Sequence, residues 1–265
     1  MQEPNGVKSH GGAVVAEDLV LARGGDVALA ASSFSVRTGT LTAVVGPNGS
    51  GKTTVLHAIA GLLPPAAGRL SVLGADPALA RDRVAYVLQS PKVDEAIPVT
   101  AREVVTLGRY AERGLFGRLT DEDRGRVQEA MDRLDVADLA DRHLRELSAG
   151  QRQRVLVAQA LAQDADVMLM DEPSTSLDIA GTAVIDEVIA AECAAGRTVL
   201  VTTHALAEAM EADHVLLLAG RVIASGPPAE VLVRSNLTEA YAGLVVDVGG
   251  APMLLDDAAA HGHSH

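Results

Sequence analysis

The sequence predicts an α/β fold with a mostly parallel sheet, and two observations lead to this prediction. Four short apolar runs are typical of buried strands: "LTAVVG" (41–46), which is rich in β-branched residues, "VAYVLQ" (84–89), "DVMLMD" (166–171) and "TVLVTTH" (198–204). Helical stretches lie between several of these runs, and such alternation is typical of parallel sheets covered by helices on both faces. The chain has 265 residues and is 48% hydrophobic, which is enough for one large domain.

The first 40 residues predict a small N-terminal antiparallel β subdomain. "VVAEDLVLA" (14–22) and "SSFSVRTG" (32–39) resemble strands, and Gly24–Gly25 supplies a turn between them. After the strand at 41–46, "TTVLHAIAGLL" (53–63) is expected to form a helix that Pro64–Pro65 stops.

Residues 93–150 show no strand pattern and predict a helical subdomain inserted into the sheet. Thr100 and Glu103 form a capping-box pattern that opens a helix. Thr120 can cap a second helix, in which Val127, Met131 and Leu134 recur at helical spacing.

The expected organisation is a flexible N-terminus (1–12), one domain (13–240) and a C-terminal extension (241–265). Within the extension, "LVVDVGGAPMLL" (244–255) suggests a hairpin around Gly249–Gly250. "DDAAAHGHSH" (256–265) is typical of a flexible tail.

Charge and composition argue against several classes of protein. The net charge of −13 is unfavourable for a groove that binds a nucleic-acid backbone, so we expect no nucleic-acid partner. Cys193 is the single cysteine, which rules out a disulfide framework within the chain and agrees with a reducing compartment. We expect it to be an ordinary buried helix residue. No export signal is visible, and apolar runs such as "VLLLA" (215–219) are too short to cross a bilayer.

The most specific motif lies between the strand at 41–46 and the following helix. It fits the phosphate-binding pattern G-x-x-x-x-G-K-[ST], in which glycines let backbone N–H groups converge on an anion next to a helix N-terminus. In this pattern the lysine reaches the β- and γ-phosphates and the hydroxyl of the last residue ligates Mg²⁺. A chance glycine-rich turn would explain neither the flanking strand and helix nor the Lys-Thr pair. The candidate nucleotide-binding residues are Gly46, Pro47, Asn48, Gly49, Ser50, Gly51, Lys52, Thr53 and Thr54.

Two acidic residues end the strand at 166–171. Asp171 is expected near the Mg²⁺, where a carboxylate ligand is needed. Glu172 is placed to polarise an attacking water, which is a general-base role. The alternative interpretation is an acidic pair that caps a helix.

"ELSAGQRQRVLVAQALA" (146–162) predicts a second anion site at a helix start whose first N–H groups are free. One nucleotide loop does not require two such sites in one chain. We therefore expect a homodimer, in which this site faces the ATP held by the other copy. The candidate residues are Ser148, Ala149, Gly150 and Gln151.

These motifs, in this order and at about this spacing, resemble the ATP-binding subunit of ATP-binding cassette (ABC) transporters over about residues 14–240. The resemblance implies a P-loop NTPase (RecA-like) fold and hydrolysis of ATP with Mg²⁺. It also implies that Gln89 senses Mg²⁺ and faces the membrane partner, that the loop Ser176–Asp178 communicates across the dimer, and that His204 contacts the γ-phosphate.

Two residues depart from the family pattern. Arg23 stands about where the family has an aromatic residue that stacks on adenine, and a guanidinium plane can also stack on a base. Ala149 replaces a glycine of the family's LSGGQ signature. Its methyl group, close to the γ-phosphate, is either tolerated or weakens closure of the dimer.

The segment "PVTAREVVTLGRYAERGLFGRLTDEDR" (98–124) resembles bacterial manganese/zinc-type metal importers, and siderophore and haem importers share part of it. The resemblance implies integral membrane permease subunits and an extracytoplasmic solute-binding protein as partners, with the chain at the cytoplasmic face of the membrane. His261, His263 and His265 either bind Zn²⁺ or Mn²⁺ or are incidental to a flexible tail. A siderophore, haem or other substrate is one alternative. A non-transport ABC ATPase of DNA repair or translation is another, but the single cassette, short insert and acidic charge argue against it.

Overall fold

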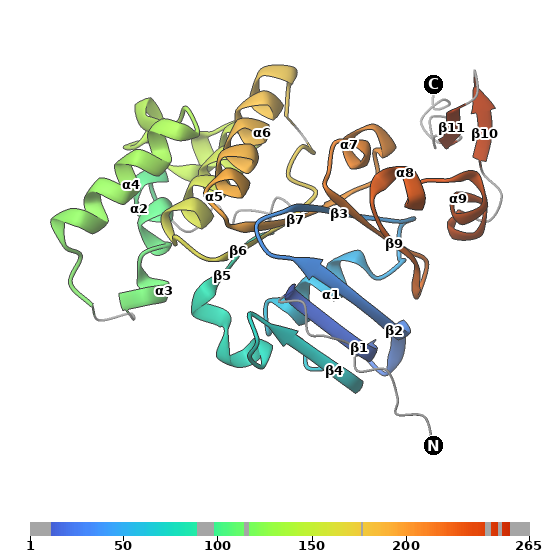
Figure 1. Ribbon diagram of the computed structural model, residues 1–265. Coiled ribbons are helices and arrows are strands. Elements are labelled where there is room, and N and C mark those ends of the chain that lie inside the picture. The colour runs from blue at the N-terminus through green and yellow to red at the C-terminus, as the bar shows by residue number, and fades with distance from the viewer. Residues whose placement is uncertain are drawn as a thin grey trace.

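The computed structural model describes residues 12–88, 98–113, 117–175, 177–241, 245–248 and 251–254. In this part of the chain, a six-stranded sheet forms the centre of the protein (Figure 1). Its strands lie in the order β5 (Val84–Val87), β6 (Val167–Asp171), β7 (Thr198–Thr203), β3 (Leu41–Val45), β8 (His214–Leu218) and β9 (Val222–Gly226). All neighbours pair in parallel except β8 and β9, so the predicted mostly parallel sheet is confirmed.

The central strands are mostly apolar, and helices and a second sheet cover their two faces. All five residues of β6 are buried, which is typical of parallel sheets rather than of sheets with one wet face. One core includes Leu169 and Leu200 of the sheet together with Leu56 of helix α1 (Lys52–Ile59) and Leu21 of the N-terminal sheet. Helix α1 therefore lies between the two sheets.

The predicted N-terminal antiparallel sheet is confirmed. Strands β1 (Gly12–Arg23) and β2 (Asp26–Arg37) pair around a turn in which Gly24 and Gly25 both have positive φ, +63° and +97°. Strand β4 (Ala67–Val72) pairs with the other edge of β1. The sequence did not predict β4, because its first three residues are exposed and "AGRLSV" lacks a strong strand pattern.

Helix α1 ends earlier than predicted. Its last residue is Ile59, and Gly61 follows in the left-handed conformation with φ +69°. The N–H of Leu62 donates to the carbonyl of His57, which closes the helix end. The expectation that Pro64–Pro65 stop the helix is therefore wrong, since a glycine ends it first.

The segment between β5 and β6 is helical where it is described. It contains α2 (Ala101–Leu107), α3 (Tyr110–Arg113), α4 (Asp121–Arg133), the short 3₁₀ turns Ala137–Leu139 and Leu144–Glu146, and α5 (Ala149–Ala162). Thr100 and Thr120 cap α2 and α4 as predicted, each within a complete capping box. Val127, Met131 and Leu134 are at most 4% exposed and belong to the core that α5 shares with the sheet.

Four further helices lie in the C-terminal half of the described chain. Helix α6 (Ile179–Ala194) follows β6, α7 (Leu206–Met210) follows β7, and α8 (Pro228–Val231) and α9 (Arg234–Ala240) follow β9. Two further 3₁₀ turns, Pro77–Leu79 and Arg81–Arg83, precede β5. None of the described helices is long and apolar enough to span a bilayer.

The C-terminal hairpin is observed, with β10 (Val245–Val248) antiparallel to β11 (Ala251–Leu254). It lies at the end of the molecule away from the helices α2–α4 (Figure 1). Gly249–Gly250 and the tail histidines lie outside the described residues. Cys193 is in helix α6 as expected, but it is only half-buried.

Candidate functional site

The topology brings three predicted motifs to one edge of the central sheet. Strands β6, β7 and β3 are neighbours and run parallel, with Asp171 level with Thr202 and Val45 level with Thr203. Their carboxyl ends therefore bring three features side by side: the glycine-rich loop 46–53 (the phosphate loop), the acidic pair Asp171 and Glu172, and His204. This is the edge at which ligands bind in open α/β sheets.

The glycines of the loop after β3 are required for different reasons. A Cβ at Gly46 would lie 2.2 Å from the carbonyl oxygen of Leu218, so the first glycine permits close packing of two backbones. Gly49 and Gly51 have φ values of +78° and +102°, which favour glycine. Gly51 also precedes α1 without a side chain that could cap it, and the first turn of α1 carries no acidic residue. The N-terminus of α1 is thus left available for an anion.

Lys52 folds back over the same loop. Its side chain is 7% exposed, and Nζ donates to the carbonyl oxygens of Gly46 at 2.7 Å and Pro47 at 3.2 Å. Burial lowers the pKa of Lys52 from its ordinary value, while the charges of Glu172 and Asp171 oppose this shift. A phosphate oxygen at this loop could replace the carbonyls as the acceptor for the ammonium group.

Asp171, the last residue of β6, accepts hydrogen bonds from three side chains. Its Oδ2 accepts hydrogen bonds from Thr53 Oγ1 at 2.8 Å and from the Tyr86 hydroxyl at 3.5 Å. Its Oδ1 accepts one from Thr202 Oγ1 at 2.5 Å. Burial and the neighbouring Asp171 charge raise the pKa of Tyr86, so this phenol stays a hydrogen-bond donor. The predicted proximity of Thr53 and Asp171 is observed.

Glu172 adopts a backbone conformation that is uncommon for a residue with a side chain. Its φ is +50°, in the left-handed region. Its N–H donates to Thr202 Oγ1 at 2.9 Å, and its Oε2 accepts from Thr175 Oγ1 at 3.4 Å. The chain therefore turns sharply directly after Asp171.

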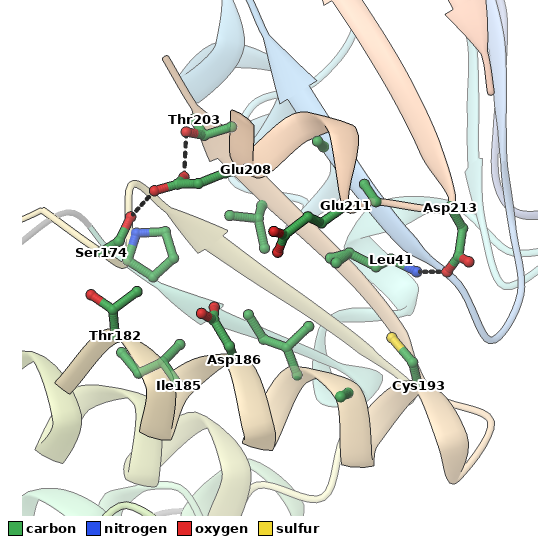
Figure 2. A pocket seen from close by; sticks show the side chains of 16 residues that line it. Leu41, Ser174, Thr182, Ile185, Asp186, Cys193, Thr203, Glu208, Glu211 and Asp213 are labelled. Atoms are coloured by element: carbon green, nitrogen blue, oxygen red, sulfur yellow. Dashed lines mark hydrogen bonds between the residues drawn. The ribbon is translucent and has the colours of Figure 1, made fainter. Parts of the chain in front are cut away.

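Glu208 connects the two segments that carry Glu172 and His204. His204 follows β7 and is exposed. Just before it, Thr203 donates through Oγ1 to Glu208 Oε2 at 2.5 Å, and Ser174 donates through Oγ to Glu208 Oε1 at 3.1 Å (Figure 2). Glu208 therefore joins the loop after Glu172 to the end of β7.

Sequence analysis missed both Thr202 and Glu208. In the pattern, Thr202 is an ordinary β-branched residue of a strand, and Glu208 is one of several acidic residues on a short helix. The pattern of alternating strands and helices does not indicate which side chains of neighbouring elements will be in contact.

The predicted second anion site forms a separate hollow of about 340 Å³. It is lined by the residues at the start of α5 together with Arg154, Leu177 and Asp178, and none of its lining residues belongs to the loop 46–53. The structure thus places Ser148, Ala149, Gly150, Gln151 and Asp178 on one surface, apart from the phosphate loop of the same chain.

The expectation that all first-turn N–H groups of α5 are free is partly wrong. The N–H of Gln151 donates to Ser148 Oγ at 3.1 Å, and Gln151 Oε1 accepts from the N–H of Ser148 at 2.9 Å. This capping box occupies the serine hydroxyl. Asp178 likewise caps α6, because its Oδ1 accepts from the N–H of Gly181 at 2.8 Å.

Arg23 is the last residue of β1 and is exposed. Its positive charge lowers the pKa of His57 on α1, although burial is the larger cause of that shift. The His57 ring meets Tyr86 edge-on, with ring centroids 5.7 Å apart. Gln89 and Ser176 lie outside the described residues.

Comparison with known proteins agrees with this site. The family described as ABC transporter matches residues 29–175. The zinc transport system ATP-binding protein TroB of Treponema pallidum is 39% identical over 88% of this chain and 88% of its own length. The manganese transport system ATP-binding protein MntB of Bacillus subtilis is 38% identical over 87% and 90%. A solved ATP-binding cassette of an ABC transporter, MJ1267 in its ADP conformation, is 26% identical and superposes with a TM-score of 0.75 over 88% of this chain and 99% of its own. The glycine-rich loop after β3, the acidic strand end and these likenesses together show that the chain belongs to the ABC transporter family, as an ATP-binding subunit with the fold of an ABC ATPase.

Proposed function

We propose that this chain hydrolyses ATP to power the uptake of a divalent metal ion, zinc or manganese, through a membrane permease. The metal is supported by the names of its relatives, a zinc and a manganese transport system protein at 39% and 38% identity. The proposed assembly contains two copies of this chain at the cytoplasmic face of the membrane, permease subunits, and an extracytoplasmic solute-binding protein. Gln89 is proposed to lie at the contact with the permease.

The observation that carries the ATPase proposal is the convergence of Lys52, Thr53, Asp171 and Glu172. The loop glycines and the N-terminus of α1 would receive the phosphates, and Lys52 would exchange its two carbonyl acceptors for phosphate oxygens. Arg23 is proposed to stack on the adenine. Lys52, Thr53, Asp171 and Glu172 would need no change of fold for these steps, because they lie together at one edge of the central sheet.

The residues present fit a Mg²⁺ ion. Thr53 Oγ1 and Asp171 Oδ2 are 2.8 Å apart. Adjacent ligands of an octahedral Mg²⁺, each about 2.0–2.1 Å from the ion, lie about 2.9 Å from one another. Thr53 and Asp171 would hold the ion, with Gln89 as a further ligand. When bound, Mg²⁺ neutralises part of the charge on the phosphate oxygens.

Glu172 is proposed as the general base and His204 as a contact to the γ-phosphate. Glu172 follows the metal-binding strand end, and its carboxylate would take a proton from the attacking water. His204 lies at the end of the neighbouring strand, where an imidazole can donate to a phosphate oxygen. The signature residues Ser148–Gln151, with Asp178, would come from the second copy, since they form a hollow separate from the phosphate loop of their own chain.

The test is Glu172→Gln in the complex of this chain with its permease. The substitution keeps the size of the side chain and removes the base. We expect ATP binding to persist and turnover to fall at least about a hundredfold, the lower end of general-base effects. Glu187→Gln, on the exposed face of α6, is the matched control and should hydrolyse ATP normally. Hydrolysis by Glu172→Gln at the parent rate would refute the assignment.

The metal is tested in the same complex with its solute-binding protein. We expect Zn²⁺ or Mn²⁺ to stimulate ATP hydrolysis. Stimulation only by a siderophore–iron complex or by haem would instead assign the chain to the related class of importers.

A further inference from the structure

We propose that Thr202 is a positioning residue whose single hydroxyl sets both the Asp171 carboxylate and the backbone of Glu172. The inference rests on the proposed function of those two acidic residues. Thr202 is 0% exposed, near the end of β7. Its Oγ1 donates to Asp171 Oδ1 at 2.5 Å and accepts from the N–H of Glu172 at 2.9 Å.

The parallel register explains how one side chain reaches both residues. Thr202 lies level with Asp171 on the neighbouring strand. Beyond Asp171 the chain leaves the sheet, so the N–H of Glu172 turns towards β7 and meets a side-chain oxygen there. The Thr202 hydroxyl thus continues the link between the two strands for one residue past the end of β6.

The first consequence is a fixed orientation of the Asp171 carboxylate. Its two oxygens have different neighbours, since Thr202 holds Oδ1 while Oδ2 faces Thr53 and Tyr86. Partial rotation about the bond to the carboxylate would break the contact with Thr202, and a half-turn only exchanges the two equivalent oxygens. Thr202 therefore directs Oδ2 to the side on which Thr53 would share a metal ion.

The second consequence concerns the direction of the Glu172 side chain. A left-handed residue with a side chain is uncommon and persists only where its surroundings hold it. The hydrogen bond from Glu172 N to Thr202 is one such restraint. Without it, the turn after Asp171 would have more freedom, and the water-activating carboxylate would be placed less precisely against the γ-phosphate.

A neighbouring threonine shows that these contacts are not a necessary result of burial. Thr42, on β3 of the same sheet, is also 0% exposed, and its Oγ1 has no hydrogen-bond partner in the described part of the chain. A buried threonine is thus accommodated in this sheet without using its hydroxyl. At Thr202, by contrast, the hydroxyl both donates to Asp171 and accepts from the N–H of Glu172.

The decisive variant is Thr202→Val, which keeps the shape of the side chain and removes the hydroxyl. A hydrogen bond to a charged group is strong enough to account for a change of about 10- to 100-fold. We expect kcat for ATP hydrolysis in the permease complex to fall by about that factor, while KM for Mg²⁺-ATP rises only by about 3- to 10-fold, because part of the Mg²⁺-dependent affinity is lost. Thr202→Ser restores a hydroxyl and should recover most of kcat. Thr42→Val is the matched control and should behave as the parent.

A second readout does not depend on turnover. We would measure the dissociation constant of ATP with and without Mg²⁺ for the purified chain. If Thr202 orients Asp171, the gain in affinity on adding Mg²⁺ should shrink several-fold, by about 3- to 10-fold, in Thr202→Val and not in Thr42→Val. Affinity for ATP without Mg²⁺ should stay unchanged, because Thr202 does not touch the phosphate loop.

Two results would overturn the inference. One is a folded Thr202→Val protein with the parent's kcat and the parent's gain from Mg²⁺. The other is equal loss of kcat in Thr202→Val and Thr202→Ser with an unchanged gain from Mg²⁺, which would indicate packing alone. If Thr202→Val does not fold, Thr202→Ala is judged by the same outcomes. Glu172→Gln in the same assay separates the two claims, since normal turnover there would refute the proposed function itself.

Discussion

The helical segment contains a buried ion pair, and its burial allows the loss of stability on breaking it to be estimated. Arg109 and Asp123 are 1% and 0% exposed, and Arg109 Nε donates to Asp123 Oδ1 at 3.0 Å. The guanidinium also donates to the carbonyl oxygen of Ala162 at 2.8 Å. Asp123 Oδ2 accepts from both N and Oγ1 of Thr120 at 2.8 Å, so one carboxylate pairs the cation and completes the cap of α4.

Asp123→Asn should lower the free energy of unfolding by about 3 kcal/mol. Breaking a buried pair by removing one charge costs about 3–5 kcal/mol, because the other charge stays buried and loses its closest counter-charge. The lower end applies here, since the amide oxygen of asparagine can still accept one hydrogen bond and Arg109 keeps its carbonyl partner. A loss of this size is a large part of the total stability of about 5–15 kcal/mol of a typical domain.

The assay is urea unfolding followed by circular dichroism, and Asp121→Asn is the control. Asp121 lies in the first turn of the same helix and pairs with Arg124, but its side chain is 100% exposed. Removing its charge should change the unfolding midpoint little. Equal midpoints for Asp123→Asn and the parent, or equal losses in both variants, would refute the reasoning from burial.

Three further outcomes are expected. If Arg23 stacks on adenine, Arg23→Ala should weaken ATP binding between about two- and thirtyfold, the range of cation–π contacts, and Arg23→Tyr should restore it; an unchanged dissociation constant would rule the contact out. Burial raises the pKa of Cys193 to about 11, so alkylation by iodoacetamide should be slow at pH 7 and accelerate as the pH rises towards that value; rapid, pH-independent labelling would argue against this. Deleting residues 257–265 should leave basal ATP hydrolysis intact, and weaker Zn²⁺ binding by the truncated chain in calorimetry would identify the tail as a metal site.

Features encoded in short stretches were predictable from the sequence. The phosphate loop depends on glycines at fixed spacing, and the caps at Thr100 and Thr120 depend on residues three positions apart. Four of the five parallel strands, β5, β6, β7 and β3, follow from apolar runs bounded by helices, whereas β8 was not predicted. Asp171 could be placed near Thr53 because Asp171 ends strand β6 and Thr53 lies in the first turn of α1, the helix that follows β3.

Features that depend on contacts between distant segments were not predictable. Strand β4 is held by its pairing with β1, not by its own pattern. Thr202 and Glu208 gain their importance from Asp171 and Ser174, which are 31 and 34 residues away in the chain. By contrast, the reciprocal capping of Ser148 and Gln151 was predictable, because the two residues stand at capping-box spacing, although free N–H groups were expected there.

In the proposed dimer, the phosphate loop of one copy and the signature residues Ser148–Gln151 of the other form one ATP site. The most direct test is a structure of Glu172→Gln with Mg²⁺ and ATP, determined in the permease complex. The account predicts a dimer in which the ATP held by Lys52 of each copy also contacts Ser148 of the other copy. Two ATP-bound chains that remain separate, with each Ser148 far from any phosphate, would contradict it.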